Sequence, residues 1–158
     1  MALPVREERP LDTHIVELHW DDRTAVAQAA TLLLTVFAGD GRYSSERIDQ
    51  ELRPSPPPLQ RQFFVAYRHG RLVGIGGAKS ADWASNTHIL YLSAVEPESR
   101  GHGIGRALIR ARVDWVRGQN PHGRILVSTA KPKRYRDHGF RPVNRERIGD
   151  KHLMLLEY

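Results

Sequence analysis

The sequence predicts a single domain of mixed α/β fold, with a central, mostly antiparallel sheet and helices on both of its faces. Three observations predict it. A chain of 158 residues suits one hydrophobic core, because two domains within that length would each be marginal. The expected order of elements is strand, two helices, three strands, helix, strand, helix and strand. Two of the strands are joined by His69-Gly70, a pair typical of a tight antiparallel hairpin.

The first three elements follow from periodicity and from the residues that end each run. A β-branched run predicts a strand over 13–20. Apolar residues at intervals of three and four predict a helix over 23–37 with one buried face. Ser44 is a typical N-cap and Pro54 stops a helix, so a short second helix is expected over 44–52.

The later elements are predicted in the same way. Gly74, Gly76 and Gly77 lie close together in one expected strand and indicate a bulge, a close backbone approach or a plain irregular strand. Gly118 is the expected end of the long amphipathic helix. The strands are predicted over 62–68, 71–79, 87–95, 124–129 and 151–158, and the helices over 103–118 and 132–138.

Composition excludes several kinds of chemistry. The chain has no cysteine, which removes disulfides and a cysteine acyl-enzyme and favours direct transfer if acyl chemistry occurs. Its eight histidines are scattered without ligand spacing, so we expect no metal. Neither a nucleophile elbow nor a P-loop is present. Residues 1–12 are charged and broken by proline, which predicts a flexible tail before a single domain over 13–158, in a cytoplasmic protein without a membrane segment.

The net charge of +6 admits more than one partner. This charge fits nucleic acid, but it fits a phosphate-rich cofactor or a merely solvated basic surface equally well, and the solvated surface is the favoured interpretation. The aromatic residues are few and do not alternate with arginine clusters, as a stacking platform for single strands would require. We therefore expect no nucleic-acid partner.

The segment that carries chemistry is the loop between the strand over 87–95 and the helix over 103–118. Gly101, Gly103 and Gly105 stand at alternate positions where the loop opens into the helix. A helix start offers unpaired backbone N–H groups and the positive end of the helix dipole, and glycines let an anion approach them. The loop therefore predicts a cradle for a pyrophosphate group.

The spacing of these glycines separates two kinds of phosphate cradle. A dinucleotide fingerprint would require glycine at position 106, where the chain has arginine. The run Arg100-Gly101-His102-Gly103-Ile104-Gly105 instead resembles the pattern of the GNAT family, the GCN5-related N-acetyltransferases. The resemblance extends over about residues 13–158.

This resemblance implies a GNAT-like fold and an N-acetyltransferase that moves an acetyl group from acetyl-CoA to a primary amine. The two strands over 87–95 and 124–129 are then expected to separate and hold the pantetheine arm, with a backbone N–H near Val95 polarising the thioester carbonyl. The expected cofactor-binding residues are Ala94, Val95, Arg100, Gly101, His102, Gly103, Ile104, Gly105, Arg106 and Ser128.

A second resemblance supports the first. Tyr135, followed four residues later by Gly139-Phe140, is similar to the family's tyrosine segment. The resemblance implies that Tyr135 is the general acid, because a tyrosine hydroxyl is protonated at neutral pH and can donate to a leaving thiolate.

The chain also departs from the family pattern. Ser128 stands where relatives often have asparagine, and Lys131-Pro132-Lys133 replaces more apolar residues. The strand face that carries Ile89 and Tyr91 has no carboxylate or histidine, so the general base stays unassigned.

Candidates for that base are His88, Glu96 and a residue of the loop over 40–45. The absence of an obvious base favours either an acceptor amine of low pKa, such as an α-amino group, over a lysine-type amine, or a base that acts through water.

Two other functions stay open at this point. A GNAT-like module could bind acyl-CoA or a partner without turnover, and a basic GNAT-like domain could dock on nucleic acid. The acceptor, a small molecule or peptide amine, is not identified by the sequence. Acyl length and oligomeric state, including a homodimer, are equally open.

Overall fold

The computed structural model describes residues 13–144 and 149–158. The tail expected over 1–12 lies outside the described residues. Seven strands form one sheet in the order β1-β2-β3-β4-β5-β7-β6. Neighbouring strands are antiparallel except for β4 and β5, which are parallel. The predicted mixed, mostly antiparallel sheet is therefore confirmed.

The strands are β1 (Thr13–Glu17), β2 (Arg61–Arg68), β3 (Arg71–Ser80), β4 (Thr87–Val95), β5 (Arg124–Thr129), β6 (Arg141–Pro142) and β7 (His152–Glu157). The helices are α1 (Arg23–Val36), α2 (Ser45–Leu52), α3 (Ile104–Gln119) and α4 (Pro132–Arg136), with a 3₁₀ turn over Pro97–Ser99.

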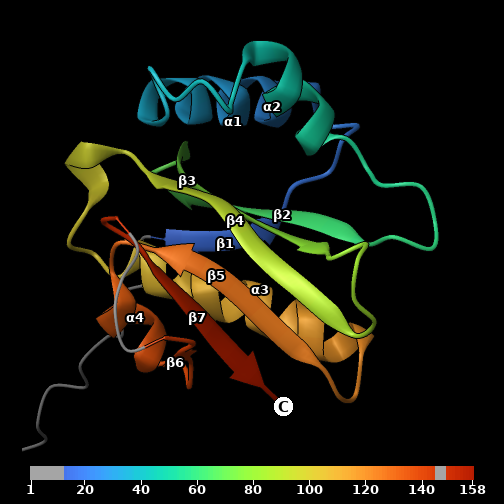
Figure 1. The fold of residues 1–158 in the computed structure, drawn as a ribbon. Helices are drawn as coiled ribbons and strands as arrows, with labels where there is room; N and C mark the ends of the chain where they lie inside the picture. The colour runs from blue at the N-terminus through green and yellow to red at the C-terminus, as the bar shows by residue number, and fades with distance from the viewer. Residues whose placement is uncertain (1–12, 145–148) are drawn as a thin grey trace, which may run out of the picture.

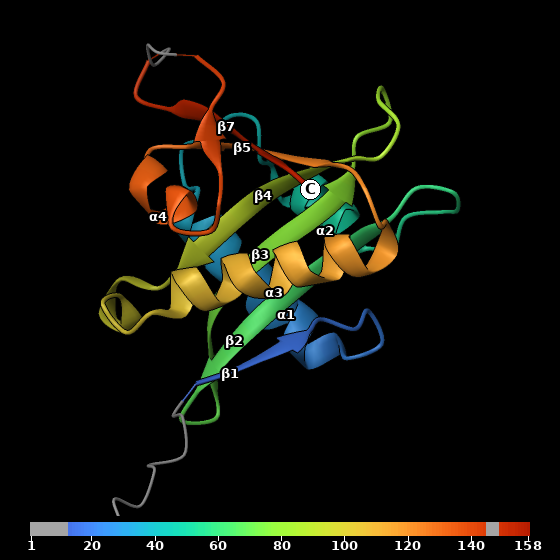
Figure 2. The same cartoon turned by 90° about the horizontal axis from the view of Figure 1, so that it is seen from below.

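Helices cover both faces of the sheet, as predicted. In Figure 1, α1 and α2 lie above it and α3 lies below; Figure 2, seen from below, shows α3 crossing the strands with α4 beside β5 and β7. The core is divided accordingly. One cluster packs α1 and α2 on the sheet through residues such as Leu33 and Ile48, and the others pack α3 through residues such as Ile109 and Val116.

Side-chain caps hold the starts of the first two helices, and the cap at Ser44 is the predicted one. The Asp22 side chain accepts a hydrogen bond from the Ala25 amide at 3.1 Å, and Ser44 accepts one from Arg47 at 3.1 Å. Each cap satisfies an amide of the first turn, which would otherwise have no partner. His69 and Gly70 both have positive φ angles, the backbone geometry of a two-residue hairpin.

The largest differences from the predicted boundaries are at β1 and α4, and several other ends differ by one residue. β1 ends at Glu17 rather than at residue 20, and α4 ends at Arg136, because a turn leads into Gly139 at φ +93°. Gly118 does not end α3, which continues to Gln119. The strand β6 has only two residues and was not predicted.

Candidate active site

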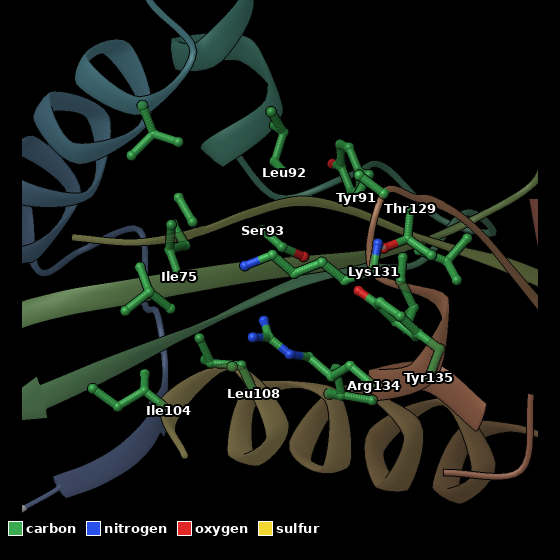
Figure 3. Close-up of a pocket in the computed structure, with 18 of the residues that line it drawn as sticks. Ile75, Tyr91, Leu92, Ser93, Ile104, Leu108, Thr129, Lys131, Arg134 and Tyr135 are labelled. Carbon is green, nitrogen blue, oxygen red and sulfur yellow. Dashed lines mark hydrogen bonds between the residues drawn. The ribbon is translucent and has the colours of Figure 1, made fainter. Parts of the chain in front are cut away.

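The site lies where the parallel strands β4 and β5 separate. Their pairing runs from Thr87 and Arg124 to Leu90 and Val127 and then stops. Just beyond, Leu92 has a positive φ of 49°, and the β3–β4 register shifts between Ile75 and Gly77. A bulge turns the strand locally. The two strands thus enclose one side of a cavity of about 830 Å³ (Figure 3).

The glycine loop forms one end of this cavity. Gly101 and Gly103 have φ angles of +86° and +77°, a left-handed conformation that glycine adopts readily and other residues rarely adopt. A Cβ at either position would have no atom within 4 Å, so the space above both is open. Gly103 is the N-cap of α3, whose 16 residues make a substantial helix dipole. The loop therefore presents a helix start to the cavity without side chains in the way.

The structure brings most of the expected cofactor residues to this cavity. His102 is the exception, because it is exposed and does not line the cavity. Arg106 forms an ion pair with Asp137 of the turn after α4, which ties the start of α3 to that turn. The lining includes Ala94, Val95, Arg100, Gly101, Gly103, Ile104, Gly105, Arg106, Ser128 and Tyr135.

Arg134 of α4 lies beside the glycine loop, and the sequence did not indicate this position. A Cβ on Gly105 would lie 2.6 Å from Nη1 and 3.1 Å from Cζ of Arg134, so the guanidinium rests directly on the first turn of α3. Figure 3 shows the side chains of Lys131 and Arg134 reaching into the cavity from α4. The only sequence signal was the basic Lys131-Pro132-Lys133 segment.

Tyr135 is fixed between α4 and the sheet. The residue is 6% exposed, and its ring packs edge-on against Phe140 at a centroid distance of 5.4 Å. The Phe140 amide donates a hydrogen bond of 3.2 Å to the Tyr135 carbonyl. The hydroxyl points into the cavity (Figure 3). The spacing between Tyr135 and Phe140 therefore holds the tyrosine ring in the cavity wall and directs its hydroxyl into the cavity.

Arg112 of α3 is a buried cation beside the same cavity and was not predicted. It is 1% exposed and donates hydrogen bonds to the Leu108 carbonyl, the Gly77 carbonyl and Ser93 Oγ. Among the described residues no carboxylate forms an ion pair with it. Burial lowers the pKa of this guanidinium. A Cβ on Gly76 would lie 2.8 Å from Arg112 Cζ, so the glycine leaves room for the cation. Of the predicted alternatives for these glycines, the bulge is present, between Ile75 and Gly77.

The candidates for a general base lie elsewhere. His88 is buried against Trp115 and its Nε2 lies 2.9 Å from Gln60 Oε1; burial lowers its pKa. Glu96 forms an ion pair with Arg71. Neither residue lines the cavity. From the loop over 40–45, Arg42 and Tyr43 line it, and neither is a carboxylate.

Tyr91, which lines the cavity, has a carboxylate partner in Glu51 of α2. The Tyr91 hydroxyl donates a hydrogen bond to Glu51 of α2, which also lies 3.3 Å from Arg61 Nη1 and from Lys79 Nζ. Burial raises the pKa of Glu51, but the hydrogen bond from Tyr91 and the nearby cations outweigh it and lower the pKa overall. Burial, with Glu51 beside it, raises the pKa of Tyr91. Glu51 was missed because 40 positions separate it from Tyr91.

Part of the cavity wall is aromatic and basic. Phe37 and Tyr43 pack with ring centroids 5.2 Å apart. Asp40 holds Arg42 in a two-pronged contact of 3.1 and 2.9 Å, and these hydrogen bonds from Arg42 lower the pKa of Asp40 to about 2. Lys151, which precedes β7, also lines the cavity.

Within 13–144 and 149–158, His, Asp and Glu side chains form no group of three that could hold a metal ion. In the same ranges, no helix has the length and apolarity needed to cross a bilayer.

Comparison with known proteins identifies the class. Residues 14–140 match the model of the Acetyltransferase (GNAT) family. The chain therefore belongs to the GNAT family of acetyltransferases, as its glycine loop suggested. No curated protein sequence matches the chain.

Solved structures share the fold at low sequence identity. Escherichia coli ElaA has 16% identity and a TM-score of 0.73, with 90% of this chain and 98% of that chain covered. The aminoglycoside 6'-N-acetyltransferase from Enterococcus faecium has 18% identity and a TM-score of 0.73 over 91% and 96%. Rv2747 from Mycobacterium tuberculosis, solved in complex with CoA, has 18% identity and a TM-score of 0.67 over 92% and 99%.

Proposed function

We propose that residues 13–158 form a cytoplasmic N-acetyltransferase domain that moves an acetyl group from acetyl-CoA directly to a primary amine. One observation carries the proposal. The glycine loop at the start of α3 opens into the same cavity that receives the Tyr135 hydroxyl and the separated ends of β4 and β5. An acyl donor whose phosphates bind at the glycine loop would thus have its thioester end beside Tyr135, which can donate a proton.

The residues present fit a CoA diphosphate. Open space above Gly101 and Gly103 leaves their amides accessible, and the start of α3 favours an anion. Arg100, Arg106 and Arg134 add positive charge at the same end. In this proposal Ser128 contacts the pantetheine arm, where β5 has left β4.

The proposed reaction needs a neutral amine, a polarised carbonyl and a protonated leaving group. The amine nitrogen attacks the thioester carbon, and the carbon–sulfur bond breaks. Backbone N–H groups of β4 between the bulge at Leu92 and Val95 stabilise the developing oxyanion. Tyr135 donates its proton to the thiolate, and the proton lost by the attacking nitrogen restores the tyrosine through solvent. The products are an N-acetyl amine and CoA, and no covalent enzyme intermediate forms.

Acetyl-CoA-dependent release of CoA, measured with a panel of amines, tests the activity. We expect release with at least one amine and little without an acceptor. CoA binding without release for any amine would support an acyl-CoA-binding module. Tight DNA or RNA binding with a steep salt dependence would instead support a nucleic-acid domain.

A further inference from the structure

The segment of β4 that would face the thioester has little backbone support of its own. The pairing of β4 with β5 stops after Leu90, and on the other side the register with β3 shifts between Ile75 and Gly77. Leu92 within this segment has a φ of 49°, a left-handed conformation that a residue other than glycine keeps only when its surroundings enforce it. Contacts from outside the sheet therefore have to help hold this segment.

Arg112 of α3 supplies such contacts to both strands of the bulge. Its Nη1 atom donates hydrogen bonds to the Gly77 carbonyl of β3 at 3.3 Å and to Ser93 Oγ of β4 at 2.9 Å. Its Nε atom donates one of 3.0 Å to the Leu108 carbonyl of its own helix, which fixes the direction of the side chain. Ser93 lies on the cavity wall (Figure 3). The guanidinium therefore ties α3 to the two strands where the sheet is interrupted.

Neither the donor's phosphates nor a protein carboxylate accounts for this cation. Arg112 lies roughly 12 Å along the helix axis from the start of α3 at Ile104, more than two turns away from the glycine loop. It is 1% exposed, and none of the ion pairs among the described residues includes it. Burying a charge without a counter-ion is unfavourable, and an apolar side chain would fill the space with less desolvation. What the guanidinium adds is its set of charge-assisted hydrogen bonds, which are stronger than neutral ones.

We propose that Arg112 is a positioning residue for acetyl transfer, whose guanidinium holds the bulged segment of β4 so that its backbone N–H groups between Leu92 and Val95 point at the thioester carbonyl. This inference rests on the proposed function and adds to it a residue that does not itself touch the reacting atoms. With the segment loosened, the glycine loop and Ser128 would still bind the rest of the donor. The carbonyl, however, would be less polarised and the developing oxyanion less stabilised.

Isotope-edited infrared spectroscopy of acetyl-CoA, labelled with ¹³C at the thioester carbonyl, measures this polarisation without turnover. Hydrogen bonds to a carbonyl oxygen weaken the C=O bond and lower its stretching frequency. Without an acceptor amine, we expect the band of the bound thioester to lie below that of free acetyl-CoA in the parent protein. In Arg112→Met, which keeps an unbranched apolar chain in the same space, about half or more of that shift should be lost, while the Kd for CoA stays within about threefold.

Arg110→Met is the matched control. It removes the same charge from α3 at a side chain that is 80% exposed and lies outside the cavity lining. It should leave both the band shift and the Kd for CoA unchanged. With an accepted amine, kcat should fall by roughly 10–100-fold in Arg112→Met and stay within about twofold in the control.

A second variant moves the guanidinium without removing it. A Cβ at Gly76 would lie 2.8 Å from Cζ and from Nε of Arg112, and Gly76 does not line the cavity. Gly76→Ala should therefore reduce the band shift as Arg112→Met does, and it tests the inference even if Arg112→Met does not fold. The double variant should lose little more than either single one, because both substitutions act through the same contact. Additive losses would contradict the assignment.

The outcomes separate this inference from the proposed function. If acetyl-CoA does not bind the parent protein, the proposed function fails and the role of Arg112 fails with it. If acetyl-CoA binds but its band is unshifted in the parent, or is shifted equally in the parent, Arg112→Met and Gly76→Ala, only the role of Arg112 is overturned. A loss of CoA affinity as large as the loss of kcat would also overturn it, because Arg112 would then support the fold of the whole site rather than the position of the β4 amides.

Discussion

The hydroxyl of Tyr91 in β4 donates a hydrogen bond to the carboxylate of Glu51 in α2, 40 positions away in the chain. The contact joins α2 to the wall of the cavity. Arg61 and Lys79 lie on the same carboxylate, each at 3.3 Å. A half-buried network of this kind is costly to break, because removing its anion leaves two cations without a partner.

Glu51→Gln should therefore destabilise the fold by about 1–3 kcal/mol at neutral pH. Because the folded pKa of Glu51 lies below the ordinary value of 4.5, its contribution is complete above that value and is lost as the pH falls through the folded pKa. Urea unfolding at pH 7 and at pH 3.5 should show a smaller difference between parent and variant at the lower pH. Glu46→Gln, an exposed position of the same helix, is the control. A difference that grows toward low pH would contradict the network.

The second prediction concerns Arg134 at the start of α3. Its guanidinium rests on Gly105, so Arg134→Met should weaken acetyl-CoA binding by about 1–2 kcal/mol, or roughly fivefold to thirtyfold in Kd. Arg136→Met removes the same charge from α4 at an exposed residue outside the cavity and should change Kd little. Calorimetric titration with acetyl-CoA gives both values. Equal effects of the two substitutions would show that Arg134 acts only through the overall positive charge of α4 and not by direct contact with the ligand.

Much of this fold was predictable because its signals are local. The capping residues Asp22 and Ser44, the His69-Gly70 turn and the glycines before α3 each determine the backbone within a few positions. The contacts of Arg112 and Glu51 are long-range: each side chain crosses to another element, and no spacing along the chain indicates it. The position of Arg134 depends on how α4 packs beside α3, and the only sign of it in the sequence is a basic segment. His102 lies within the glycine motif but turns outward, which a linear motif does not show.

The third prediction concerns Tyr135. Tyr135→Phe keeps the edge-on contact with Phe140 and removes the hydroxyl from the cavity. If Tyr135 is the general acid, turnover should fall by roughly 10²–10⁴ while the Kd for acetyl-CoA stays within a few-fold. Tyr158→Phe serves as the control, because Tyr158 does not line the cavity and its buried hydroxyl has no hydrogen-bond partner in the described structure. CoA release with any accepted amine provides the rate. Turnover near that of the parent would remove Tyr135 from proton transfer.

The fourth prediction addresses the glycine loop itself. Gly103→Glu places a negative charge where the diphosphate would approach, and it also strains a backbone at φ +77°. Gly103→Asn adds a side chain without the charge and with less strain, since asparagine tolerates this conformation better than most residues. Both should lower the midpoint of thermal unfolding without ligand, but only Gly103→Glu should abolish stabilisation by acetyl-CoA. Loss of stabilisation in both would indicate that backbone strain alone disrupts the site.

The thermal unfolding of the parent protein with and without acetyl-CoA tests the central claim, that this cavity holds the acyl donor. At about 100 times its Kd, a ligand of the folded state adds about 2.7 kcal/mol. For a domain of this size that corresponds to a rise of roughly 5–10 °C in the midpoint. The account predicts such a rise with acetyl-CoA and with CoA, and its absence with both at saturating concentrations would contradict the assignment of the cavity.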